Sequence, residues 1–125
     1  MKHEYSDEFS YPPALIMPAK VIVPHDARLV RSYRAKLDTA ADLSVVPRSF
    51  IEEFRPASFY KRTVRQTGRV EYTFILSIEL DGRVYSVEVV PHNAPYLLIG
   101  RDILNQLVLI ANGPNEVFEL IHSSP

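Results

Sequence analysis

Residues 70–90, VEYTFILSIELDGRVYSVEVV, contain two runs in which apolar and polar side chains alternate. Alternation with a period of two is typical of a strand with one buried face. The runs are separated by Asp81-Gly82, a pair that favours the tight turn of an antiparallel hairpin. The stretch therefore predicts two strands joined at this turn. On the first strand, the residues expected to share one face are Tyr72, Phe74, Leu76, Ile78 and Leu80.

On both sides of this hairpin the chain continues in short β-rich runs separated by turn residues. Residues 61–65 and the run from Val70 flank a polar stretch with a glycine, which predicts a second hairpin. Helical spacing of apolar residues is confined to one short helix near the end, with one further helical turn before Pro56. We therefore expect an all-β domain, closed or sandwiched, of roughly eight or nine short strands. The remaining expected strands cover residues 21–23, 27–37, 43–46, 107–110 and 117–121.

Composition excludes several kinds of chemistry. The 125 residues include no cysteine, so disulfides, thiolate metal sites and cysteine nucleophiles are ruled out. A formal net charge of −1 leaves no basic excess for phosphates, and we expect no nucleic-acid partner. The four histidines show no metal-ligand spacing, and no Gly-rich phosphate loop occurs, so neither a metal nor a cofactor is expected.

The chain is expected to form one domain preceded by an arm. Residues 1–17 mix charges, aromatic residues and a Pro-Pro pair without helical or strand period, which predicts a flexible arm before a domain over 18–125. No apolar run approaches the ~18 residues of a membrane helix, so no membrane contact is expected. The first residues lack the apolar core of a secretory signal, and we expect a cytoplasmic protein.

Residues 36–47, KLDTAADLSVVP, are the first candidate for chemistry. An apolar strand runs into Asp38-Thr39, two small residues and Asp42, and then into a second apolar strand. Small side chains at Ala40 and Ala41 allow another backbone to approach, and a carboxylate at a strand end points out of the sheet. By itself, the pattern favours an Asx or Thr turn between strands over a catalytic site.

A second motif follows some sixty residues later, where residues 95–104 read PYLLIGRDIL. The two motifs, with a hairpin between them, resemble the retroviral-type (retropepsin-like) aspartic peptidases, especially their small bacterial single-lobe members. In that family Asp-[Thr/Ser]-Gly-Ala-Asp carries the catalytic aspartate, a Gly-rich hairpin forms a flap over the substrate, and Ile-Ile-Gly-Arg-[Asn/Asp] opens the closing helix. The order of elements matches from about residue 18 to residue 120.

The resemblance implies a barrel-like acid-protease fold with one short C-terminal helix, and an aspartic endopeptidase that hydrolyses peptides or proteins. Asp38 would be the catalytic residue. Because the chain holds one such motif among six aspartates, the active enzyme would be a homodimer with one Asp38 from each subunit at the two-fold axis. Two carboxylates about 3 Å apart cannot both ionise, so they share a proton and activate a water without metal or cofactor.

The resemblance also implies roles for neighbouring residues. Thr39, Ala40 and Ala41 would support the catalytic loop, with Thr39 hydrogen-bonded to the partner's motif. Asp42 would bind the substrate backbone and form an ion pair with Arg101. The other implied substrate-binding residues are Gln66, Thr67 and Gly68 at the flap tip and Val45, Tyr96 and Leu98 in the pocket walls. For the three apolar residues, ordinary core packing is the alternative.

Two positions depart from the family pattern. Ala40 stands where the family has glycine, and its methyl group could crowd a substrate or, if φ were positive, cost roughly 1 kcal/mol. Lys36 stands where the family has an apolar residue, and on a regular strand its ammonium would favour the charged form of Asp38. Two alternatives to the peptidase therefore stay open: a dimer that binds extended peptides with weak or absent hydrolysis, and a purely structural dimer.

Overall fold

The computed structural model describes residues 1–57, 60–64 and 68–122. The predicted central hairpin is confirmed: β6 (Arg69–Leu80) pairs with β7 (Arg83–His92), and Leu80 lies opposite Arg83. Asp81 and Gly82 both have positive φ, 51° and 79°, as a two-residue turn of this type requires. Of the expected apolar face, all but Tyr72 are buried, because Tyr72 lies where β6 leaves the rest of the sheet to pair with β5 (Tyr60–Val64).

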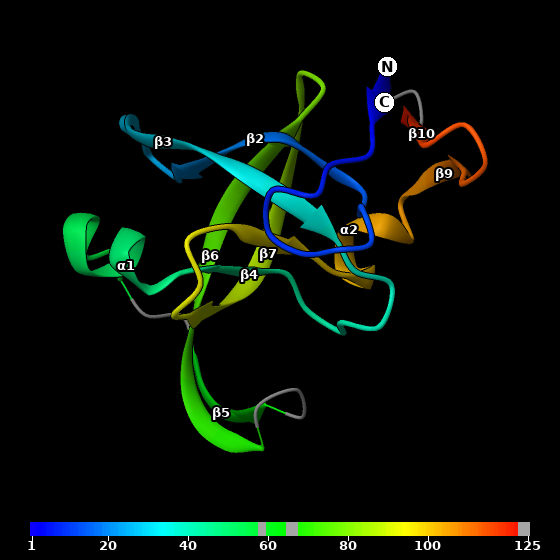
Figure 1. Cartoon of the computed structure of the whole chain (residues 1–125). Helices are drawn as coiled ribbons and strands as arrows, with labels where there is room; N and C mark the ends of the chain where they lie inside the picture. Colours follow the sequence, from blue (N-terminus) through cyan, green and yellow to red (C-terminus); the bar gives the residue numbers. More distant parts are fainter. Residues whose placement is uncertain (58–59, 65–67, 123–125) are drawn as a thin grey trace.

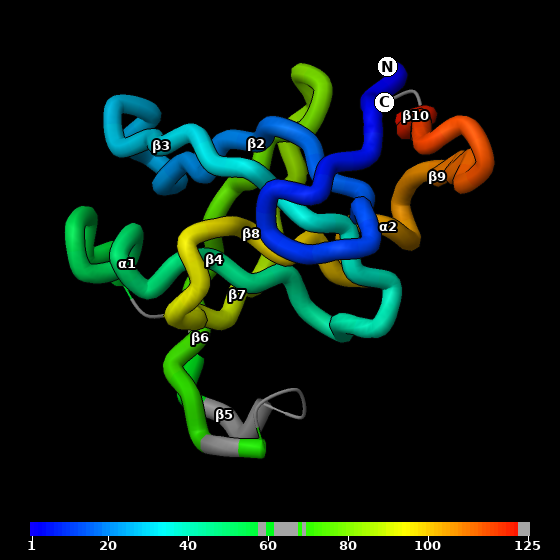
Figure 2. The backbone as a smooth tube through the Cα atoms, viewed as in Figure 1, coloured from blue at the N-terminus to red at the C-terminus, as the bar shows by residue number. Residues whose placement is uncertain are grey.

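Six strands close into a barrel (Figures 1 and 2). Neighbouring strands follow the order β2-β3-β8-β4-β7-β6, and β6 pairs with β2 to complete the ring. The β3–β8 and β4–β7 pairings are parallel and the other four are antiparallel. The expected all-β, barrel-like class is therefore confirmed. The strands not yet delimited are β2 (Ile16–Val23), β3 (Asp26–Leu37), β4 (Val45–Pro47) and β8 (Leu97–Ile99).

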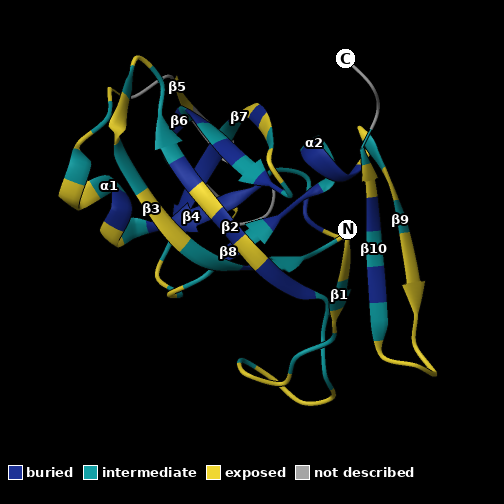
Figure 3. Cartoon of the chain, turned by 90° about the horizontal axis from the view of Figure 1, so that it is seen from above, coloured by how far each residue is buried: buried dark blue, intermediate teal, exposed yellow. Residues whose placement is uncertain are grey.

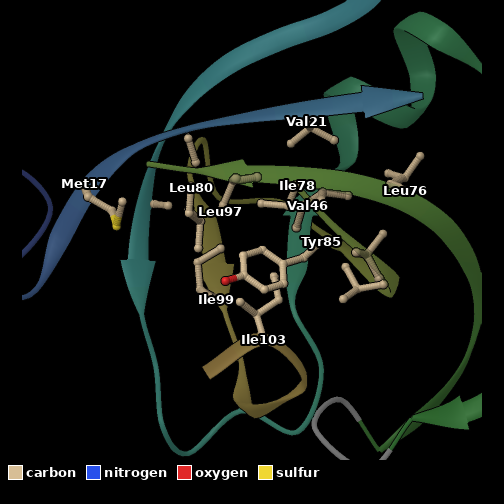
Figure 4. Packing of buried hydrophobic residues seen from close by; sticks show 14 of the residues in the cluster. Met17, Val21, Val46, Leu76, Ile78, Leu80, Tyr85, Leu97, Ile99 and Ile103 are labelled. Atoms are coloured by element: carbon tan, nitrogen blue, oxygen red, sulfur yellow. The ribbon is translucent and has the colours of Figure 1, made fainter. Parts of the chain in front are cut away.

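The interior of this barrel is an apolar core (Figure 4). Side chains from every strand of the ring meet there, and most of those labelled in the figure have no exposed surface. Because burial of apolar surface is the main favourable contribution to folding, this core sets the positions of the strand ends. Members from different strands include Met17, Val46, Leu76, Val89 and Leu97.

A second, three-stranded sheet lies beside the barrel (Figure 3). Its order is β1 (Lys2–Glu4), β10 (Val117–His122) and β9 (Leu107–Asn112), all antiparallel. The pairing of β9 with β10 confirms the predicted terminal hairpin. The inner face of this sheet carries Phe118 and Leu120, which are buried in the main core.

The prediction of a flexible arm over residues 1–17 was wrong. β1 pairs with β10, Ser6 and Ala14 form a bridge, and Ile16 and Met17 are buried at the start of β2. The arm lacked any recognisable period because its strand is three residues long and its partner lies more than 110 residues away. With β1 included, the described residues form ten strands, slightly more than expected.

The helical turn expected before Pro56 is present as a helix, in addition to the short helix expected near the end of the chain. The described residues contain α1 (Arg48–Phe54) and α2 (Arg101–Leu104), and α1, at seven residues, is the longer. α1 begins after Pro47 and ends at Arg55 in the left-handed conformation, just before Pro56. Among the residues that the structure describes, neither helix has the length or apolar character to cross a membrane.

Candidate active site

The parallel pair β3–β8 has two distinct faces. Ala35 pairs with Leu97 and Leu37 with Ile99, and all four side chains pack toward the core. Side chains alternate along a strand, so Lys36 and Leu98, which are also register partners, lie on the opposite face. Continuing the alternation places Asp38 and Tyr96 on that second face too. We call it the site face.

Asp38 is the first residue after β3, and the loop that follows begins with its own carboxylate. Its N–H donates to the carbonyl of Ile99 at 2.9 Å, which extends the pairing with β8 by one residue. Its Oδ1 accepts the N–H of Ala40 at 3.0 Å, and its carbonyl accepts that of Ala41 at 3.2 Å. The Asx turn expected as the alternative is therefore present, and it orients the carboxylate.

Arg101, the first residue of α2, binds the Asp38 loop at three points. Its N–H donates to the Ala41 carbonyl at 2.9 Å and its Nη1 to the Thr39 carbonyl at 2.8 Å. Its Nη2 forms an ion pair with Oδ1 of Asp42, so the predicted pair is formed. The hydroxyl-bearing residue Thr39 and its neighbour Ala40 are exposed in the single chain.

Gly100 lies directly beneath this loop. A Cβ added there would lie 2.7 Å from the carbonyl carbon of Leu43 and 2.9 Å from the carbonyl oxygen of Ala41. Such distances are shorter than van der Waals contact, so only glycine allows the loop and the start of α2 to pack this closely. The glycine of the second motif thus has a packing role.

Ser44 and Asp102 form a hydrogen-bonded junction below the loop, which the sequence analysis missed. Oδ2 of Asp102 accepts the Ser44 N–H at 2.9 Å, and Oδ1 accepts the Ser44 hydroxyl at 2.7 Å and the Ile103 N–H at 2.9 Å. The Ser44 Oγ also accepts the N–H of Gly100 at 3.1 Å. The available signal was Ser44 itself, a hydroxyl inside an apolar run, which needs a partner when it is buried.

Ala40 does not adopt the conformation that would have strained it. The non-glycine residues with positive φ in the described chain are His25, Arg55, Asp81 and Glu116. Ala40 therefore carries no backbone penalty for replacing the glycine of the family pattern. Its exposed methyl group remains the only difference at this position.

By strand register and alternation, the apolar residues predicted to line the pocket share the site face with Asp38, although Val45 is only 5% exposed. Val45 of β4 lies opposite Leu98 in an antiparallel pairing and shares its face, whereas Val46 points into the core. Tyr96 is half-buried, and its carbonyl accepts a hydrogen bond of 2.7 Å from the ring of His92. Burial lowers the pKa of His92, partly offset by this hydrogen bond.

The predicted flap corresponds to the β5–β6 hairpin, which projects from the barrel (Figure 1). Val64 pairs with Arg69 at its end, and Gly68 is exposed with φ of 67°. Gln66 and Thr67, the other residues assigned to the flap tip, lie outside the described residues. The structure thus places the hairpin but not the contacts of its tip.

Another polar cluster lies away from the site face. Asp81, almost fully buried, contacts the ring nitrogens of His3 at 2.9 Å and His122 at 3.3 Å. These contacts join the β6–β7 turn to β1 and β10 and explain part of the docking of the terminal sheet. In the described part of the chain, no group of three or more histidine or acidic side chains is placed to hold a metal ion.

Comparison with known proteins identifies the fold. No protein-family model matches the chain, and no curated protein matches its sequence. Among solved structures, a retropepsin-like aspartic protease from Rickettsia conorii aligns with 98% of this chain and 91% of its own, with a TM-score of 0.66 and 10% identity. The retroviral protease-like domain of Ddi1 from Leishmania major aligns over 86% and 87%, with a TM-score of 0.55 and 15% identity.

Viral structures match as well. The prototype foamy virus protease-reverse transcriptase aligns with 88% of this chain at a TM-score of 0.56 and 15% identity, but the aligned part is 12% of that protein's length. This chain therefore spans about an eighth of that viral protein. Together with the closed barrel and the Asp38 loop seated on Gly100 and Arg101, these likenesses show that the chain has a single-lobe acid-protease fold. More narrowly, the fold is retropepsin-like.

Proposed function

We propose that the chain is an aspartic endopeptidase that acts as a homodimer, with one Asp38 from each subunit. The observation that carries the proposal is the state of the Asp38 carboxylate. It stands at the end of a core strand, on a loop tied to β8 and α2, and accepts a single hydrogen bond from the described residues, that of Ala40. A carboxylate has about four acceptor sites, so this one retains the capacity to bind a water or a second carboxylate.

Two such carboxylates at a two-fold axis supply both a base and an acid. They share one proton, because two negative charges so close together are unfavourable. The ionised Asp38 takes a proton from a water as the water oxygen attacks the peptide carbonyl carbon, and the protonated Asp38 donates to the carbonyl oxygen. The leaving nitrogen then takes the proton from the Asp38 that accepted it from the water, and the C–N bond breaks. A hydroxyl of the tetrahedral intermediate returns its proton to the other Asp38, which restores the dyad with no covalent bond between enzyme and substrate.

The terminal sheet supports the dimer. Its outward face carries Val108, Ile110 and Ile121, which are 54%, 50% and 46% exposed, and β9 is one of its two edge strands. An apolar face next to an unpaired strand edge is a surface suited to pairing with a second chain. We assign it to a second copy of this chain.

An extended peptide fits the remaining surroundings of Asp38. The half-buried Leu98 and Tyr96 provide apolar contacts on the site face, with Val45 buried in the same face. The β5–β6 hairpin supplies the flap with Gly68 and, by the family resemblance, Gln66 and Thr67. Asp42, already paired with Arg101, retains an exposed edge for a substrate N–H. A peptide of neutral overall charge suits a protein with a net charge of −1.

The decisive experiment compares cleavage of an unfolded protein and a peptide library between pH 3 and 7 by the wild type and by Asp38→Asn. We expect the substitution to lower the rate by on the order of 10²- to 10⁴-fold, as loss of general acid–base catalysis does. Asp26→Asn is the matched control, because this carboxylate lies at the other end of β3 from Asp38 and pairs with Arg28. A statine-type transition-state analogue is expected to inhibit the wild type.

Other outcomes lead to different conclusions. If the wild type binds peptides but cleaves none at any pH, the chain is a peptide-binding dimer of the same fold. Ala40, whose methyl group replaces the glycine of the family pattern, is then the first residue to test. If sedimentation shows a monomer at micromolar concentration with and without peptide, the shared active site is wrong. Equal cleavage by Asp38→Asn and the wild type would exclude Asp38 as the catalytic residue.

A further inference from the structure

The N-terminal segment reaches the site face, although residues 1–17 have no role in the function proposed above. Phe9 stacks on Tyr96 with ring centroids 4.4 Å apart and planes inclined by 29°. Figure 2 shows this segment, in blue, looping past the end of β3 on its way to β2. Tyr96 lies three residues before Ile99, whose carbonyl accepts the Asp38 N–H, so the contact is close in the chain to the catalytic loop.

Tyr96 contacts two aromatic rings. Phe9 stacks on it, and the ring of His92 lies nearly perpendicular to it, with centroids 5.8 Å apart and planes inclined by 88°. His92 belongs to β7 and is fixed by the barrel, whereas Phe9 comes from a separate part of the chain. Removing Phe9 would leave the Tyr96 ring without its stacked partner.

The loop that carries Phe9 is itself anchored. Ser6 and Ala14 exchange two backbone hydrogen bonds, of 2.9 and 2.8 Å, which close the loop at its base. Glu8 accepts a hydrogen bond of 2.7 Å from Arg34 of β3, and the Leu15 carbonyl accepts the Leu37 N–H at 2.9 Å. The position of Phe9 is therefore set by the fold, because the neighbouring Glu8 forms an ion pair with β3, the strand that precedes Asp38.

We propose that Phe9 is a positioning residue for substrate selection: by stacking on Tyr96 it fixes an apolar wall on the site face that prefers peptides with a large apolar side chain beside the cleaved bond. The inference rests on the proposed peptidase function, because it assigns a preference to that same site. Phe9 acts through Tyr96 and takes no part in the bond-breaking step.

The test uses peptides that differ only in the residue beside the cleaved bond, which is Phe, Leu or Ala. For Phe9→Ala we expect KM to rise roughly two- to ten-fold for the Phe and Leu peptides, the range expected for one aromatic pair, with kcat within about two-fold. KM for the Ala peptide stays unchanged. Phe9→Tyr keeps a stacking ring and is expected to restore the preference, and Asp7→Ala, an exposed change in the same loop, to leave it intact.

Binding separates this inference from the peptidase proposal. Statine-containing peptides with Phe, Leu or Ala beside the statine hydroxyl are titrated calorimetrically into the wild type and Phe9→Ala. A Phe9-dependent preference without any cleavage would support the wall and overturn the peptidase. If the wild type and Phe9→Ala both cleave peptides with the same preference, the apolar wall is wrong and the peptidase proposal stands. The same conclusion follows if Phe9→Ala loses affinity equally for all three peptides. No binding and no cleavage would overturn both.

Discussion

The Asp38 loop and the Ser44–Asp102 junction beneath it each contain a carboxylate, and the two carboxylates differ in how many hydrogen bonds they accept. Asp102 accepts three hydrogen bonds, two from Ser44 and one from Ile103, so most of its acceptor capacity is used within the chain. Asp38 accepts one, from Ala40. The Asp38 carboxylate is thus available for chemistry. The loop that carries it rests on the Asp102 carboxylate, which is not available. The hydrogen bonds of Asp102 hold the loop in place, and the Asp38 carboxylate keeps the capacity to accept further hydrogen bonds.

Breaking the junction is expected to have the largest effect on stability. Asp102→Asn replaces an acceptor by an NH₂ group that faces donors of Ser44 or Ile103, and we expect the free energy of unfolding to fall by about 2–4 kcal/mol. Because the loop rests on this junction, cleavage is expected to fall too. Chemical denaturation followed by circular dichroism measures the first effect.

The contrast with Asp38→Asn sharpens this prediction. That substitution keeps the Oδ1 acceptor for Ala40, so we expect unfolding to change by less than about 0.5 kcal/mol while cleavage is lost. An equal loss of stability in Asp102→Asn and Asp38→Asn would show that the two carboxylates do not differ in how far their hydrogen bonds support the fold.

Gly100→Ala tests the close packing between the loop and α2. The added methyl group would meet the backbone of Leu43 at 2.7 Å, and we expect a loss of about 1–3 kcal/mol in unfolding free energy, with impaired cleavage. Gly113→Ala is the matched control, because a Cβ there meets nothing within 4 Å. Similar stability for both variants, measured by thermal denaturation, would show that the loop moves away at little cost.

Ala40→Gly tests the open part of the loop. Ala40 does not have positive φ, so glycine gains nothing in the folded state and only adds conformational freedom to the unfolded chain. We therefore expect the free energy of unfolding to fall by roughly 0.5–1 kcal/mol. Removing the exposed methyl group is expected to lower KM for peptides. Steady-state kinetics with one peptide checks this, and an unchanged KM would show that the methyl group does not crowd the substrate.

The smallest expected effect comes from His92, which supports Tyr96 at the margin of the site face. Burial lowers the pKa of His92 below its usual value near 6.5, so the folded state binds fewer protons than the unfolded state in that range. Its contribution to stability is therefore present above pH 6.5 and is lost as the pH falls through the lowered pKa. His92→Gln, which keeps an N–H donor for Tyr96, is expected to flatten this part of the stability profile between pH 7 and 5. An identical profile in both proteins would contradict it.

The parts of the molecule that could be predicted are those whose signals are local. Alternation over residues 70–90 with Asp81-Gly82 predicted the central hairpin, and the two motifs indicated the Asp38 loop and its pairing with Arg101. The Ser44–Asp102 junction could not be predicted, because its partners lie 58 residues apart and neither motif names the contact. Phe9 and Tyr96 lie even farther apart in the sequence, and no periodic pattern indicates their contact.

By itself, the sequence determined the strand-rich class and the main turns, because alternation and turn chemistry act over a few residues. Asp38 became the candidate catalytic residue through the resemblance of the two motifs to a known family. Only the tertiary structure decided that the barrel closes through β2 and β6, that the first seventeen residues belong to the fold, and that Asp102 and Gly100 support the loop. These features depend on contacts between distant segments, which form only when burial of the shared core brings the strands together.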